Sequence, residues 1–186
     1  MGMNQKSFAN IVLVVVIVIV IGVVGYFAFV KKSPQVVQQT TTPIFQDESG
    51  GCGNIFVYKI DKDNTIGISV YANKERLSLF ISDKTFEIGK TNDLRVEILQ
   101  GEDIRFHYCN DVANNDKPVP KKLTGKSGEA IISTSKVDES LPVWNRNYKT
   151  TVILKDVRFS DKKGNDSDIF IDTLIFKDVN VGWLPG

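Results

Sequence analysis

Residues that could carry out catalysis are few in this chain, and they form no convincing catalytic motif. His107 is the single histidine. As a general base it would need a nucleophile nearby, and as a metal ligand it would need companions; the sequence places neither beside it. The stretch PKKLTGKS at 120–127 looks like a phosphate-binding loop, but it begins with Pro instead of Gly and precedes an expected strand instead of a helix. We therefore predict that the protein is not an enzyme and uses no cofactor.

Three aspartates near the C-terminus have the type of side chain that binds calcium. Asp161, Asp166 and Asp168 fall within or beside one expected turn and could offer carboxylate oxygens. Their spacing does not match an EF-hand loop, and turns in contact with solvent commonly contain Asp and Asn. We expect no metal site and keep these three residues as calcium candidates.

A second candidate site is the stretch LPVWNRNY at 141–148. Its residues Trp144, Arg146 and Tyr148 could stack on a sugar or hold a peptide. Alternatively, the aromatic rings fold back and cover one end of the core. Both interpretations stay open at the level of sequence.

The two cysteines, Cys52 and Cys109, lie outside the long apolar run that begins the chain. Neither belongs to a Cys-x-x-Cys pair, which makes a redox catalyst or a zinc site improbable. An even number of cysteines in an exported domain indicates a disulfide. We predict a Cys52–Cys109 bond that fixes the start of the domain.

The run from Ile11 to Val30 contains no charged residue. A helix of about 20 residues spans about 30 Å, the thickness of the hydrocarbon core of a bilayer. The run is longer than the apolar part of a secretory signal, and no small-x-small cleavage site follows it. We therefore predict a single transmembrane helix at 11–30 that contacts the lipid bilayer, after a short N-terminal tail at 1–10. Lysines flank both ends, so the predicted disulfide decides the orientation and places the C-terminal domain in the periplasm or outside the cell.

The N-terminal sequence KSFAN followed by a long apolar segment resembles the N-termini of type IV pilin-like proteins. The resemblance covers about residues 6–30 and also extends to anchors of bacterial surface proteins. It departs from the pilin pattern at Ser7, where Gly is usual, and at Val12, where pilins have Glu. The resemblance implies a minor pilin-like filament subunit as an alternative to a plain membrane anchor.

Residues 31–51 are rich in Gln, Thr, Pro, Ser and Gly and have no sustained apolar period, so we predict a flexible linker there. From residue 52 to 186, short runs that alternate apolar and polar residues predict strands in an exported domain. No helical period of ten or more residues occurs after residue 33. The expected fold class is all-β: an antiparallel β-sandwich, Ig-like or related, or a closed antiparallel sheet. The expected strands are 55–60, 66–71, 77–82, 94–99, 104–108, 129–134, 150–159 and 168–176, with an extension over 179–183 after a bulge at Asp178 or Asn180.

The charge of the chain argues against a polyanionic partner. Its net charge is +1, and without the three lysines that flank the apolar run 20 basic and 22 acidic residues remain. Nucleic-acid binding would need an excess of basic residues. We predict a membrane-anchored extracytoplasmic protein with a binding or structural role at the cell envelope, where an envelope protein or a glycan is its partner. The alternatives are the pilin-like subunit and an envelope enzyme or calcium- or carbohydrate-binding module.

Overall fold

The computed structural model describes residues 41–79, 82–110, 118–138, 140–142 and 146–182. The regular structure of these residues consists of eight strands and one short 3₁₀ helix. The predicted tail at 1–10, the predicted transmembrane helix at 11–30 and the first ten residues of the predicted linker lie outside the described residues. Within the described ranges, no helix is long and apolar enough to cross a membrane. The elements are β1 (Gly50–Cys52), β2 (Phe56–Ile60), β3 (Ile66–Ala72), β4 (Lys84–Glu87), β5 (Leu94–Gln100), η1 (Ile104–His107), β6 (Lys121–Thr134), β7 (Tyr148–Ser160) and β8 (Asp166–Val181).

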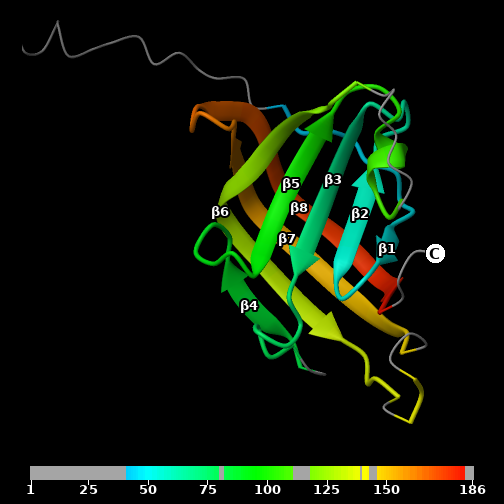
Figure 1. Cartoon of the computed structure of the whole chain (residues 1–186). Helices are drawn as coiled ribbons and strands as arrows, with labels where there is room; N and C mark the ends of the chain where they lie inside the picture. The colour runs from blue at the N-terminus through cyan, green and yellow to red at the C-terminus, as the bar shows by residue number, and fades with distance from the viewer. Residues whose placement is uncertain (1–40, 80–81, 111–117, 139, 143–145, 183–186) are drawn as a thin grey trace, which may run out of the picture. The chain divides into compact units, whose positions relative to one another are not determined.

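The eight described strands form one antiparallel sheet in the order β1-β2-β3-β5-β6-β7-β8, with β4 paired to the second half of β6. In Figure 1, β7 and β8 pass behind β3 and β5, because the sheet curls and brings its two ends together. β1 and β2 both lie close to β8. The prediction of an all-β fold with antiparallel strands is confirmed. The finer expectation of a sandwich needs a correction, because one continuous hydrogen-bonded ladder replaces two separate sheets.

The length and bending of the last three strands explain how a single sheet can curl around the core. β6, β7 and β8 contain 14, 13 and 16 residues, and register shifts interrupt the pairing of β6 with β7 and of β7 with β8. An extra residue on one strand bends it and increases its twist. Asp156 and Asp178 take left-handed φ angles of 54° and 51° within β7 and β8. The bulge expected at Asp178 or Asn180 is thus confirmed at Asp178, whose N–H donates to the Thr151 hydroxyl at 3.1 Å.

The core lies inside the curl. Along the strands the inward side chains are mostly apolar and the outward ones mostly polar, which is the pattern expected of a sheet with one buried face. Burying these side chains removes apolar surface from water and is the main stabilising contribution to the fold. The largest fully buried side chains are Phe159, Phe176, Ile55, Ile68, Leu79, Ile88, Leu94, Ile98, Ile104, Leu123, Ile132 and Leu154.

Residues 41–52, here called the seam segment, run between the two ends of the sheet. Thr41 forms a parallel bridge with Ile169 of β8, and the Gln46 N–H donates to the Ile60 carbonyl of β2 at 3.0 Å. The segment ends in β1, which pairs with β2. The predicted linker at 31–51 is therefore too long: its last eleven residues belong to the β domain. Composition misled the prediction because these polar residues are held by backbone hydrogen bonds, which do not depend on side-chain type.

Lys59 fixes the middle of the seam segment. Its side chain points inward from β2 and is buried, and its ammonium donates to the carbonyls of Gln46 at 3.0 Å and Asp47 at 2.5 Å. Burial lowers the pKa of Lys59, while the charge of Asp47 opposes that shift. Two carbonyl dipoles thus replace the water that a buried cation loses.

Two predicted strands are wrong. Residues 74–78 form turns, with the Leu77 N–H bonded to the Asn73 carbonyl at 3.0 Å, so the expected strand at 77–82 does not form over its described residues. The expected strand at 104–108 is η1 instead. In both cases apolar residues alternate over only five or six positions, a pattern that a compact turn also produces when it directs a few side chains into the core. The short strand β4 was not expected.

Candidate functional site

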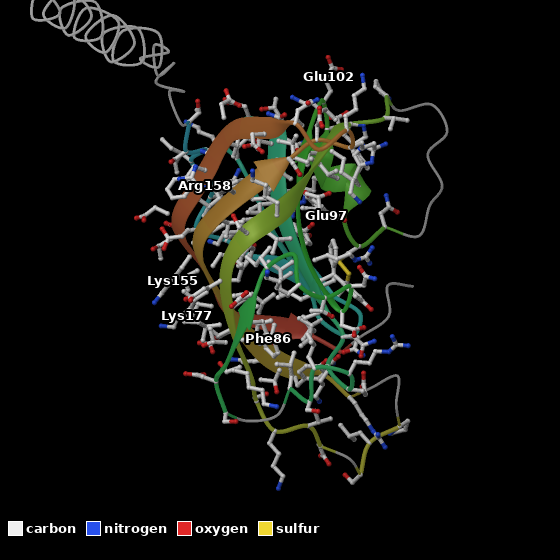
Figure 2. The ribbon with its side chains drawn as sticks, turned by 90° about the vertical axis from the view of Figure 1, so that its left-hand side faces the viewer. Phe86, Glu97, Glu102, Lys155, Arg158 and Lys177 are labelled. Carbon is white, nitrogen blue, oxygen red and sulfur yellow. A yellow bond between two sulfur atoms is a disulfide. The ribbon has the colours of Figure 1, made fainter. Side chains whose placement is uncertain are left out.

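The disulfide Cys52–Cys109 is present, with sulfur atoms 2.03 Å apart. Cys52 ends β1 and is 6% exposed, and Cys109 follows η1 in a left-handed conformation (φ 50°). The bond, drawn in yellow in Figure 2, joins the end of the seam segment to the η1 turn. The disulfide predicted from the even cysteine count is confirmed, and it ties together two segments that are 57 residues apart in the sequence.

A cluster of aromatic residues lies under η1 on the outer face of β2 and β3. The rings of Tyr58 and Tyr108 stack with centroids 4.8 Å apart, and Phe56 lies 5.8 Å from Tyr108. Gly67 of β3 makes room for them, since a Cβ atom there would lie 2.6 Å from the Tyr108 ring. Ile104 of η1 is fully buried beside the same glycine. The outer face of the sheet therefore has a small second core under η1, next to the disulfide.

Tyr108 is a buried polar side chain of this second core. It is 4% exposed, and its hydroxyl oxygen forms no hydrogen bond with the described residues. Burial raises the pKa of the Tyr108 phenol far above its usual range, and the neighbouring Ser69 hydroxyl only partly offsets this. The residue therefore stays neutral and serves to fill space.

A groove runs between the seam segment and η1, with Tyr58 at its floor. We call it the stapled groove and define it by Glu48, Ser49, Tyr58, Asn64, Arg105 and Phe106. It consists of two shallow depressions of about 190 and 390 Å³ that share Tyr58, Asn64 and Arg105.

Both ends of the stapled groove are fixed. At one end the disulfide joins its walls. At the other end, the Asn64 side-chain oxygen accepts a hydrogen bond from the Arg105 N–H at 2.9 Å, and the Gln46 amide donates to the Asp61 carbonyl at 3.0 Å. Asp61 itself organises the β2–β3 turn by accepting bonds from the N–H groups of Thr65 and Ile66. The walls are therefore positioned before any ligand arrives.

Several polar groups in the stapled groove have no hydrogen-bond or ion-pair partner among the described residues. They are the carboxylate of Glu48, the hydroxyls of Ser49 and Tyr58, the amide NH₂ of Asn64 and the guanidinium of Arg105. Sequence reasoning missed this set. Its members come from four separate segments, and no spacing in the sequence connects them.

The predicted binding residues Trp144, Arg146 and Tyr148 do not form an exposed group in the described structure. Trp144 lies outside the described residues. Arg146 donates from Nε to the Leu141 carbonyl at 2.8 Å. Tyr148 is 8% exposed, and its hydroxyl donates to the Asn54 carbonyl. Burial raises the pKa of the Tyr148 phenol, and the charge of Glu75 adds to the shift. Tyr148 thus covers the end of the core, as the alternative interpretation expected.

The three calcium candidates bind other groups. Asp161 accepts hydrogen bonds from the side chain and backbone of Asn165 at 2.9 Å, and these bonds lower the pKa of its carboxyl. Asp166 forms an ion pair with Lys126, and Asp168 bonds to Thr41 through its backbone carbonyl. Among the described residues, no group of three or more His, Cys, Asp or Glu side chains is arranged to hold a metal ion.

The outer faces of β7 and β8 carry charges of both signs. Lys155, Arg158 and Lys177 project from the same side of the ribbon in Figure 2. Exposed aspartates lie in the same two strands, and Asp156 and Asp178 directly follow two of these basic positions. A mixed surface of this kind contributes solubility and gives little long-range attraction for a polyanion.

His107 lies in η1 and is exposed, beside the stapled groove in sequence but not among the residues that line it. The described structure gives it no hydrogen bond to a hydroxyl or carboxyl group.

No protein-family model, curated protein sequence or solved structure matches this chain. The function must therefore be argued from the geometry.

Proposed function

We propose that this chain is a membrane-anchored extracytoplasmic protein whose all-β domain has a binding role at the cell envelope and no catalysis of its own. The disulfide between Cys52 and Cys109 is the observation that carries the proposal. Structural disulfides persist in oxidising compartments and are rare in the cytosol. The uncharged run at 11–30 is long enough to hold the chain in a bilayer, so a disulfide-bonded domain after it belongs on the outer side.

The position of the disulfide supports an anchored role. The seam segment is the part of the domain nearest in sequence to the apolar run, and it is bonded to both ends of the sheet. The disulfide closes this attachment at Cys52. A pull on the N-terminal side therefore acts on backbone pairs and on a covalent bond. This arrangement suits a domain that is held at a surface.

A binding role is supported by the stapled groove. Its walls are fixed at both ends, and uncommitted polar groups point into it. Preorganised groups bind a ligand with a smaller entropic cost than mobile ones. The partner is an envelope protein or a glycan.

Membrane topology provides the test. We expect the full chain to stay in the membrane pellet after carbonate extraction. Protease added to intact cells or spheroplasts should cut the β domain. Blocking free thiols before denaturation should leave both cysteines unlabelled until a reductant is added.

A domain that is protected from protease and has two free thiols would overturn the proposal. A mature chain that begins at Phe8 and is recovered in filaments would instead support the pilin-like alternative. Both readouts come from the same membrane preparation.

A further inference from the structure

The charges and hydrogen-bonding groups of the stapled groove favour one class of ligand over others. The inference drawn from them rests on the binding role proposed above. We propose that the groove binds a neutral, hydroxyl-rich glycan chain. Arg105, Tyr58 and Asn64 hold the chain by hydrogen bonds.

Charge excludes strongly ionic ligands. Arg105 and Glu48 are the charged side chains in the groove that have no partner among the described residues, and they balance each other. The Lys59 ammonium is bonded to two backbone carbonyls, and the Asp61 carboxylate to the Thr65 and Ile66 N–H groups. The net field in the groove is therefore small, and a polyanion or polycation finds no complementary charge.

Hydrogen-bonding capacity favours a ligand with many hydroxyls. The uncommitted groups include both donors and acceptors: a guanidinium and an amide NH₂ donate, a carboxylate accepts, and two hydroxyls do either. A sugar hydroxyl also both donates and accepts. Such groups cost binding energy when an apolar ligand buries them without partners.

Shape favours a chain over a compact small molecule. The two depressions are shallow and joined through Tyr58, Asn64 and Arg105, so a ligand lies across both of them.

The test uses the full chain in lipid nanodiscs and isothermal titration with cellohexaose and chitohexaose, with hexagalacturonate as the anionic comparison. We expect at least one neutral hexaose to bind with a Kd below about 1 mM, and the anionic one to bind more weakly. Arg105→Ala and Tyr58→Phe should each weaken binding about tenfold, the effect of one lost hydrogen bond to a polar partner.

These variants are chosen to keep the fold. The backbone N–H of Arg105 donates to the Asn64 side-chain oxygen, a bond that alanine keeps, and the Arg105 side chain has no partner among the described residues. Tyr58→Phe keeps the ring that packs on Tyr108. Arg76→Ala is the matched control, because it removes one exposed guanidinium that pairs with Asp93 outside the groove, and it should change the Kd less than twofold.

The inference is wrong if neither neutral hexaose binds at millimolar concentration. It is equally wrong if both groove variants bind like the wild type, because the ligand then lies elsewhere. An envelope protein that binds through Arg105 while glycans do not would overturn the glycan inference and leave the binding role intact. The proposed function itself is tested separately, by the protease and thiol experiments described above.

Discussion

Removing the disulfide should cost the domain a large part of its stability. The perturbation is the double variant Cys52→Ala/Cys109→Ala in the full chain. The bond connects residues 57 positions apart, so it closes a loop that contains β2, β3, β4, β5 and η1. In the chain-entropy model, a loop of this length restricts the unfolded chain enough to stabilise the folded state by about 4 kcal/mol. Small domains are usually stable by about 5–15 kcal/mol, so the expected loss is a substantial fraction of the total.

The assay is guanidinium unfolding in detergent micelles, followed by intrinsic fluorescence. Three samples are compared: the oxidised wild type, the wild type with reductant, and the double variant. We expect the reduced wild type and the variant to unfold at the same guanidinium concentration, lower than that of the oxidised protein. Their free energy of unfolding should be about 4 kcal/mol smaller. The reduced wild type controls for the lost sulfur atoms, because it keeps both side chains and lacks only the bond.

A difference in the free energy of unfolding of less than about 1 kcal/mol between oxidised and reduced protein would refute this reasoning. It would mean that the seam segment and η1 stay close together in the unfolded chain, or that they are held only loosely in the folded one. A variant that is destabilised while the reduced wild type is not would assign the loss to packing around Cys52, which is almost completely buried.

Three further predictions concern the packing around the groove and the seam. Gly67→Ala should destabilise the domain by about 1–3 kcal/mol in the same unfolding assay, because the new methyl group would overlap the Tyr108 ring; a variant as stable as the wild type would show that η1 can shift outward. Stability should fall as the pH rises above 10.0. Burial holds the pKa values of Tyr108 and Tyr148 above that of an unfolded tyrosine, so at such a pH the unfolded chain loses protons that the folded chain keeps. Unfolding midpoints between pH 8 and 11 measure this slope, and Tyr148→Phe should reduce it; an unchanged slope would exclude Tyr148 as a contributor. Lys59→Met should speed amide exchange at Gln46 and its neighbours, because it removes the ammonium that binds the two seam carbonyls, and protection equal to the wild type would show that the backbone pairs suffice.

Sequence patterns predicted β2, β3 and β5 to within one residue, but of the 14-residue β6 they predicted only residues 129–134, and they missed β4. The predicted strands at 150–159 and 168–176 correspond to β7 and β8, and the turn between them contains Asp, Lys, Gly and Asn, as expected. η1 was predicted as a strand because Ile104, Phe106 and Tyr108 alternate. In the structure Ile104 and Tyr108 are buried, whereas Phe106 is half exposed, so the alternation did not report one face of a strand. A five-residue pattern holds too little information to separate these cases.

The sequence alone determined the all-β class, the antiparallel pairing of neighbouring strands and the disulfide. Each depends on local alternation or on a count of two cysteines. Only the tertiary structure decided that the strands join in one curled sheet, that residues 41–52 fill its seam, and that Tyr58, Asn64 and Arg105 meet in one groove. These features depend on backbone hydrogen bonds and on contacts between distant segments, and neither leaves a periodic signal in the sequence. Side-chain periodicity reports which face of a strand is buried, but it does not report which strand lies beside it or which loops close over it.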